Sequence, residues 1–278
     1  MTEHIAQRVA AIQMVSGHDL QANLTVAADL MQKARAGGAS TVVLPENFAV
    51  LSTRQMVVQG QREADANGEI RGFLRQQARA LGLCIVAGSL PLASRPDGSA
   101  ISDRVRASCL VVDAEGNETA RYDKIHLFDA RVDDSHGQYR ESDTFEPGEQ
   151  VVAVETPAGR LGLSICFDLR FPELFRRLRS LGVSWVALPA AFTQHTGAAH
   201  WHTLLRARAI ENQFWVVAAG QGGQHDSKRR TYGHSLIVDP WGQVVAEAEE
   251  GEAVIFADLD HQVTERVRGN MVMDPVLK

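Results

Sequence analysis

Residues 160–173 read RLGLSICFDLRFPE and join an apolar strand directly to the start of a helix. Pro172 suits the first turn of a helix, so Cys166 is predicted to lie in a tight strand-to-helix connection. Such a connection exposes a side chain and directs the N–H groups of the helix start toward it. Both effects lower a thiol pKa and offer donors to a developing oxyanion. An isolated cysteine is more often a packed core thiol, and Cys84 and Cys109, within apolar strands, keep that interpretation.

Outward from this stretch, apolar runs alternate with amphipathic segments along the chain. Runs rich in β-forming residues predict strands at 8–15, 40–44, 83–89, 102–112, 118–124, 151–155, 160–165, 185–188, 214–219, 234–238, 243–247 and 253–258. Helical periods predict helices at 19–36, at 69–81, from Pro172, at 198–212 and up to about Arg268. Residues 125–150 have little periodicity, and so long a loop in a compact domain is usually functional. We predict an α/β fold of mixed sheets covered by helices, in one domain of residues 1–278.

Composition limits the class of protein. The chain has 278 residues, 45% hydrophobic and 22% charged, as in ordinary globular proteins. Its formal net charge of -6 gives no reason to expect a nucleic-acid or membrane partner. No run approaches the roughly 18 apolar residues of a membrane span, and the first residues lack the basic start of a signal peptide. We therefore predict a cytoplasmic protein whose three cysteines are not a disulfide framework and include at least one free thiol.

Two further polar residues stand at predicted strand ends. Glu46 follows the strand at 40–44, and a carboxylate against an apolar background is a candidate general base with a raised pKa. Taken alone, it is more often a solvated loop acid. Lys124 ends the second strand of a hairpin, where an ammonium can stabilise a thiolate or an anionic intermediate. Taken alone, it is more often an edge-strand lysine that discourages aggregation.

The segments around these residues resemble the signature segments of the nitrilase superfamily, the carbon–nitrogen hydrolases. They are LPENF at 44–48, RYDKIHLFD at 121–129 and SICFDLRFPELFRRL at 164–178, in the order that the family has. The resemblance covers residues 9 to about 265. It implies a four-layer αββα sandwich, in which two mixed β-sheets are flanked by helices, and an amidase that needs no cofactor.

The resemblance also implies roles for individual residues. Cys166 is the nucleophile, Glu46 the general base and Lys124 the cation that stabilises the intermediate. Glu141 is a second carboxylate that positions the substrate, and the backbone N–H of Phe167 assists Lys124 at the oxyanion. Cys166 attacks the amide carbonyl, the amine leaves, and water then hydrolyses the thioester.

The histidines give no prediction of a metal site. His200 and His202 are two residues apart on a predicted helix, so their imidazoles lie on different faces. His225 stands outside that helix. We therefore predict that the chemistry needs no metal.

The second half of the chain indicates a branch of the family. TGAAHW at 196–201, LLRARAIEN at 204–212 and QHDSKRRTYGHS at 224–235 are similar to the branch that contains deaminated glutathione amidase and ω-amidase. The third segment resembles the deaminated glutathione amidase side more closely. That substrate carries carboxylates at both ends, which lysine and arginine bind well. The resemblance thus implies a small carboxylated amide, with ω-amidase activity on α-keto-acid amides as the alternative.

A basic segment, together with Arg131 from the long loop, supplies candidate contacts to the substrate. These candidates are Arg131, His225, Lys228, Arg229, Arg230 and Tyr232. The alternative is that the basic run at 228–230 is a solvated face. Subunits of the family pair through helices, so we also predict a homodimer through the helices near 171–181 and 198–212.

Overall fold

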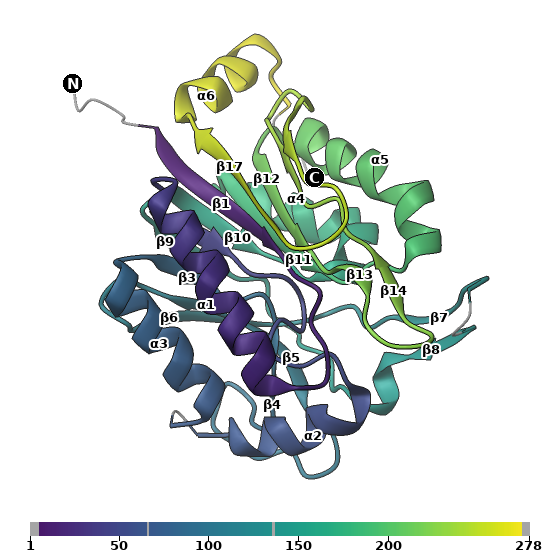
Figure 1. Ribbon diagram of the computed structural model, residues 1–278. Helices are drawn as coiled ribbons and strands as arrows, with labels where there is room; N and C mark the ends of the chain where they lie inside the picture. Colours follow the sequence, from purple (N-terminus) through teal and green to yellow (C-terminus); the bar gives the residue numbers. More distant parts are fainter. Residues whose placement is uncertain (1–5, 66, 135–136, 274–278) are drawn as a thin grey trace.

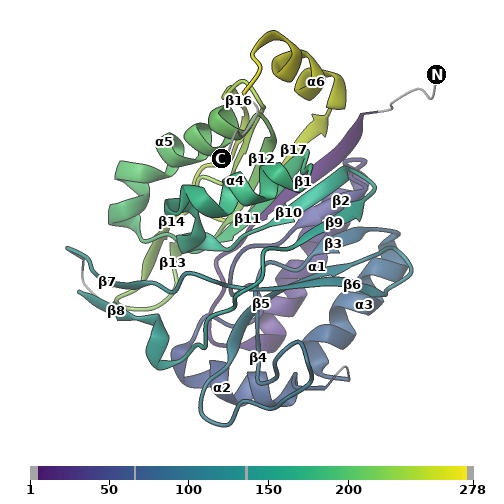
Figure 2. The same ribbon diagram turned by 180° about the vertical axis from the view of Figure 1, so that it is seen from behind.

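The computed structural model describes residues 6–65, 67–134 and 137–273. Two mixed β-sheets lie face to face, and helices cover the outer face of each sheet, as Figures 1 and 2 show from opposite sides. The α/β sandwich of four layers predicted from the sequence is confirmed.

The first sheet has seven strands, in the order β17-β1-β2-β3-β5-β4, with β6 paired to β5. β1, β2 and β3 run parallel to one another, and the other pairings are antiparallel. The strands are β1 (Gln7–Gln13), β2 (Thr41–Val43), β3 (Cys84–Val86), β4 (Leu90–Leu92), β5 (Arg106–Val112), β6 (Glu118–Asp123) and β17 (Ala253–Leu259).

The second sheet has six strands, in the order β16-β15-β12-β11-β10-β9, with β10, β11 and β12 parallel. Its strands are β9 (Ala153–Thr156), β10 (Gly159–Leu163), β11 (Trp185–Ala190), β12 (Trp215–Gly220), β15 (Leu236–Val238) and β16 (Val244–Glu247). Two separate hairpins are formed by β7 (Asp129–Arg131) with β8 (Gln138–Arg140), and by β13 (Gly222–Gln224) with β14 (Arg230–Tyr232).

Side-chain alternation along the strands explains the layers. Val9 and Ala11 of β1 belong to the core cluster that includes the second sheet, whereas Ala10 and Ile12 pack with helices α1 and α3. Helices α4 and α5 cover the second sheet (Figure 2). The helices are α1 (Leu20–Ala36), α2 (Thr53–Arg62), α3 (Glu69–Leu81), α4 (Pro172–Ser180), α5 (Gln194–Asn212) and α6 (His261–Asn270), with 3-10 turns η1 (Glu141–Asp143) and η2 (Cys166–Arg170).

Three local structures differ from the sequence prediction. Helix α2 was not expected, because its few buried positions give too sparse an apolar period. The stretch predicted as irregular contains the β7–β8 hairpin and η1. Helix α5 begins at Gln194 rather than at residue 198, since the Thr193 hydroxyl caps it by accepting from the N–H of Thr196.

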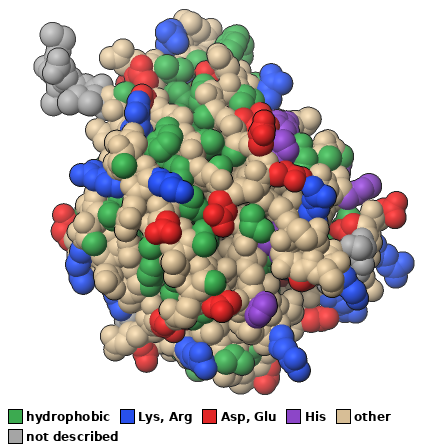
Figure 3. Space-filling model, in the orientation of Figure 1, with side chains coloured by type: hydrophobic (Ala, Val, Ile, Leu, Met, Phe, Trp, Pro, Cys, Tyr) green, Lys and Arg blue, Asp and Glu red, His purple; other side chains and the backbone are tan. Residues whose placement is uncertain are grey.

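The surface carries mixed charges. On the face shown in Figure 3, acidic and basic side chains are interspersed, which fits the net charge of -6. Among the residues that the structure describes, the helices are all too short or too polar to cross a membrane.

Candidate active site

Four of the predicted residues, each from a different segment, meet in one place. Glu46 follows β2, Lys124 follows β6, Glu141 begins η1 and Cys166 begins η2. Lys124 Nζ lies 2.8 Å from Glu46 Oε1, and 2.8 and 2.9 Å from the two carboxylate oxygens of Glu141. The Cys166 thiol lies close enough to the Glu46 carboxylate for that charge to raise the pKa of the thiol. The structure therefore brings two carboxylates and an ammonium into direct contact, with a thiol close to them.

Lys124 is a buried ammonium held between two carboxylates. Its side chain is 1% exposed. Burial lowers its pKa, but the Glu141 and Glu46 carboxylates outweigh burial and raise the pKa well above the usual range. Burial also raises the pKa of Glu141, against the effect of Lys124, and the Glu46 charge raises it further. Lys124 is thus a buried positive charge that two carboxylates compensate.

Cys166 lies in the predicted strand-to-helix connection, with a left-handed backbone of φ 48° that is uncommon outside glycine. Burial raises the pKa of its thiol well above the ordinary value, and the Glu46 carboxylate raises it further. Lys124 and the backbone N–H of Ala191 lower the pKa, but by less. The prediction of a lowered thiol pKa was therefore wrong, because lost hydration and a nearby carboxylate outweigh the cation and the N–H donor.

This arrangement can form the nucleophile during the reaction. A thiolate, not a thiol, attacks carbon. Glu46 is the carboxylate whose charge acts on the thiol, and it can take the thiol proton as Cys166 attacks. Because Lys124 contacts Glu46, the negative charge that moves onto sulfur or an oxyanion stays close to an ammonium.

Asp168 is a fully buried carboxylate that holds the turn of the cysteine, and the sequence reasoning missed it. Its Oδ2 accepts hydrogen bonds from the N–H of Ile165 at 2.8 Å and from the hydroxyl of Tyr122 at 2.6 Å. Its Oδ1 accepts from the N–H of His126 at 3.1 Å and lies 2.7 Å from His126 Nδ1. These bonds surround the left-handed residue between Ile165 and Asp168. The signal was present, because all four residues stand in two of the family-like segments.

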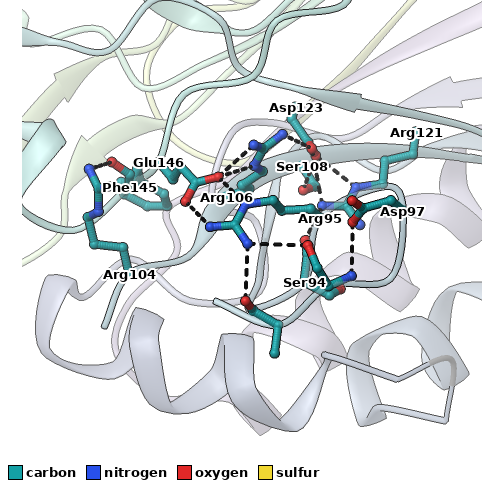
Figure 4. Close-up of polar contacts among 12 residues, drawn as sticks. Ser94, Arg95, Asp97, Arg104, Arg106, Ser108, Arg121, Asp123, Phe145 and Glu146 are labelled. Atoms are coloured by element: carbon teal, nitrogen blue, oxygen red, sulfur yellow. Dashed lines mark hydrogen bonds and ion pairs between the residues drawn. The ribbon is translucent and has the colours of Figure 1, made fainter. Parts of the chain in front are cut away.

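A network of arginines and carboxylates anchors the segments next to the lysine and after η1 (Figure 4). Arg106 of β5 lies 3.0 Å from Asp123, which precedes the lysine, and 2.6 Å from Glu146. Arg95 binds both oxygens of Glu146 at 2.7 Å. Hydrogen bonds from Arg95, and then from Arg106, lower the pKa of Glu146 to about 2, against the effect of burial. The network therefore ties the end of β6 to the segment that follows Glu141.

Cys166 opens on a small cavity that contains a cation, the guanidinium of Arg170. The guanidinium of Arg170 lies 5.8 Å from the Phe167 ring centroid and 5.3 Å from that of Phe192. Its Nη1 lies 3.2 Å from His200 Nδ1. The cavity is lined by Phe128, Cys166, Phe167, Arg170, Ala191, Phe192, Thr193 and Thr196. Sequence reasoning did not select Arg170, although it stands in the third family-like segment.

A larger cleft adjoins this cavity, because Phe128 lines both. Glu141 and Arg229 line the larger cleft, together with Tyr139 of β8. The structure therefore places one arginine of the predicted basic segment at a cleft that Glu141 also lines.

The other predicted substrate contacts lie in different places. Lys228 borders a neighbouring cleft. Arg230 forms an ion pair with Glu250 at 2.7 Å. Tyr232 stacks on the ring of His234, with centroids 4.3 Å apart. Arg131 is exposed on β7.

His225 borders the same cleft as Lys228 but is bonded through both ring nitrogens. Nδ1 lies 2.8 Å from the carbonyl oxygen of Ser16, and Nε2 lies 2.6 Å from Thr231 Oγ1. Burial lowers the pKa of His225 to about 4. His225 is therefore a neutral residue that joins two loops.

Comparisons with known proteins point to one family. The carbon-nitrogen hydrolase family model matches residues 8–269. A deaminated glutathione amidase from Yersinia enterocolitica is 40% identical over 270 residues, which cover 97% of this chain and 91% of that protein. The crystal structure of the Caenorhabditis elegans NitFhit protein has a TM-score of 0.85 and 37% identity, over 98% of this chain and 64% of that chain. An amidase mutant from Nesterenkonia, with acrylamide added to its active-site cysteine, has a TM-score of 0.78 and 26% identity, over 95% of this chain and 97% of that chain.

Proposed function

Because the chain belongs to the carbon–nitrogen hydrolase family, the amidases of the nitrilase superfamily, we propose a cysteine mechanism for its hydrolysis of amides. The observation that supports it most is the ion pair of Lys124 with Glu46 at 2.8 Å, beside the Cys166 thiol on which both charges act. Cys166 Sγ attacks the carbonyl carbon while Glu46 takes the thiol proton. The oxyanion forms beside Lys124 and the backbone N–H of Phe167.

Glu46 serves both halves of the reaction. It gives its proton to the leaving amine as the C–N bond breaks and a thioester forms. It then takes a proton from the attacking water and passes it to sulfur as the C–S bond of the thioester breaks, so that the acid is released and the thiol is restored. Glu141 holds the ammonium of Lys124 in place through two hydrogen bonds, at 2.8 and 2.9 Å, and borders the cleft in which we place the rest of the substrate.

The proposed substrate is a small amide with carboxylates at both ends, with deaminated glutathione as the first candidate. Two cations support this proposal, Arg170 in the cavity of the cysteine and Arg229 at the adjoining cleft. A guanidinium binds a carboxylate through paired charge-assisted hydrogen bonds. The name of the Yersinia relative agrees with this substrate class. Arg230 is left out, because Glu250 already pairs with it.

The proposal includes a homodimer and a cytoplasmic location. Helices α4 and α5 lie on the outside of the second sheet (Figure 2), and Leu181 and Ile210 beside and on them are 43% and 44% exposed. A second copy can cover these apolar side chains. The three free cysteines fit a reducing compartment. Light scattering on the purified protein tests the dimer.

A panel of amides tests the activity. Deaminated glutathione, α-ketoglutaramate, glutamine and a nitrile are assayed for products with the wild type and with Cys166→Ala. We expect deaminated glutathione to have the highest kcat/KM and Cys166→Ala to have no turnover. A preference for α-ketoglutaramate would retire the substrate proposal and leave the mechanism intact. Turnover near wild type in a folded Cys166→Ala protein would retire the mechanism.

Substitutions of two neighbouring arginines distinguish a direct contact with the substrate from an effect of the overall charge of the segment. Arg229→Met is expected to raise KM for deaminated glutathione by about tenfold or more, since it removes a charge-assisted contact. Arg230→Met removes the same charge one residue away, where Glu250 already pairs with it, and is expected to leave KM unchanged. Equal effects of the two variants would show that the segment acts only through its overall charge.

A further inference from the structure

Among the described residues, two imidazoles and a carboxylate gather on the outside of the second sheet. His202 comes from α5, His234 precedes β15 and Glu247 ends β16. His202 Nε2 and His234 Nδ1 lie 2.8 and 3.0 Å from the same oxygen, Oε1 of Glu247. One ligand atom of each residue lies within 4.8 Å of the other two. We propose that these three residues bind a zinc ion.

The geometry fits the size of a zinc site. Zinc binds imidazole nitrogen and carboxylate oxygen at about 2.0–2.2 Å in a tetrahedron, so its ligand atoms are about 3.3 Å apart. The two short distances in the cluster fall just below that value, and all three fall within 4.8 Å. Small side-chain movements therefore open the cluster enough to admit the ion. Two nitrogens and one oxygen favour zinc over magnesium or calcium and leave the fourth position to water.

The surroundings fix the ligands in place while leaving them accessible. Trp201 Nε1 donates to the carbonyl oxygen of His234 at 2.7 Å, and the ring of Tyr232 stacks on the His234 imidazole. His234 has a left-handed backbone, with φ 51°, that directs its side chain from the β14–β15 connection. The side chains of His202, His234 and Glu247 are 35%, 28% and 37% exposed, so an ion can reach all three.

A zinc ion at this position joins elements rather than taking part in the amide chemistry. It links α5 to the strands β15 and β16, which come later in the chain than α5. The sequence prediction of two imidazoles on different faces agrees with the partners, since His200 lies against Arg170 and His202 against Glu247. What the sequence could not reveal is that His234 and Glu247 meet His202 from other elements. Binding to the folded state alone raises the melting temperature.

Zinc titration tests the proposal. Metal-free protein carrying Cys166→Ala, which removes the reactive thiol as a competing ligand, is titrated with zinc chloride in a calorimeter, and with magnesium chloride in parallel. We expect one zinc per chain and no heat from magnesium. His202→Ala and Glu247→Gln, each added to this protein, are expected to weaken zinc binding by about tenfold or more. His195→Ala removes an exposed histidine from the same helix and is expected to leave the affinity unchanged.

A second measurement does not depend on the folding of the variants. X-ray absorption at the zinc edge of the zinc-loaded Cys166→Ala protein is expected to show two imidazoles and oxygen ligands. Sulfur ligands, binding that survives both His202→Ala and Glu247→Gln, or no saturable binding at all would each overturn the proposal.

Discussion

Replacing Lys124 with methionine removes the positive charge between two buried carboxylates and keeps much of the side-chain volume. The side chains of Glu46 and Glu141 are 4% and 16% exposed, and each lies 2.8 Å from Lys124 Nζ. Removing one partner of a buried ion pair costs about 3–5 kcal/mol, because the remaining charge is left without compensation. Glu141 keeps the N–H of Phe128 at 2.6 Å, which offsets a part of this loss. We therefore expect Lys124→Met to lose about 3 kcal/mol of unfolding free energy at about pH 8.

The loss is expected to shrink as the pH falls. Burial already raises the pKa of Glu141 in the wild type, and Lys124 opposes that shift. Without Lys124 the pKa of Glu141 rises further, so the folded variant binds its proton more tightly than the unfolded chain does. Stability then falls as the pH rises from the unfolded pKa, about 4.3, to the higher folded pKa. Below that interval the carboxyl is neutral in both states and its part of the penalty disappears.

Urea unfolding at about pH 8 and about pH 5 measures both effects for the wild type and Lys124→Met. Lys33→Met, on the exposed side of α1, is the matched control and is expected to stay within about 0.5 kcal/mol of the wild type. Adding Glu141→Gln to Lys124→Met removes one of the uncompensated charges and should restore part of the stability. A loss below about 1 kcal/mol at the higher pH, or one that does not change with pH, would refute the reasoning.

Two further variants probe the support of the site. Asp168→Asn removes a fully buried charge that accepts hydrogen bonds from Ile165 and Tyr122, and thermal or urea unfolding should show a loss of about 2–3 kcal/mol in unfolding free energy. We expect kcat to fall and KM to change little; an unchanged kcat in a destabilised protein would limit Asp168 to folding. Gly197→Ala places a methyl group against Cβ and Cγ of Tyr232, and these atoms lie too near the backbone to move aside by a rotamer change at the end of the side chain. The free energy of unfolding should therefore fall by about 1–3 kcal/mol, and wild-type stability would contradict this packing argument.

Local patterns predicted much of the fold. The apolar run and Pro172 at residues 160–173 correctly gave the strand, the connection and the helix around Cys166. Helix α2 escaped prediction because its stability comes from packing on β4, not from its own apolar period. The early start of α5 was missed because Gly197 reads as a helix breaker. Here the tertiary structure requires the glycine, since the side chain of Tyr232 occupies the space of a Cβ.

The site was predictable in part because the signals around Glu46, Lys124 and Cys166 support one another. Their protonation states were not predictable, since the pKa of a thiol depends on burial and on a carboxylate from a distant segment. The basic run was ambiguous for a different reason. Successive side chains near a strand point to opposite sides, so Arg229 and Arg230 reach a cleft and Glu250 respectively. Only the position of the β13–β14 hairpin decides which of the two faces the site.

Glu46 has two opposite effects on Cys166, and Glu46→Gln is expected to separate them. Its charge raises the pKa of the thiol, yet its carboxylate is the proposed acceptor of the thiol proton. With glutamine at this position, Lys124 remains, so the thiol pKa falls and a larger fraction is thiolate at about pH 7. Amide turnover should drop by about 10²–10⁴, the usual contribution of a general base.

Iodoacetamide labelling followed by mass spectrometry checks the other half of this expectation. Alkylation of Cys166 should be retained or faster in Glu46→Gln, although turnover is nearly lost. Cys84 is the internal control, because burial raises its pKa to about 12 in a strand away from the cavity, and it should label far more slowly. If alkylation of Cys166 fell in parallel with turnover, Glu46 would be needed to form the thiolate even at rest. Both alkylation and amide hydrolysis would then require Glu46 to form the thiolate, and the expectation that loss of its charge favours the thiolate would be wrong.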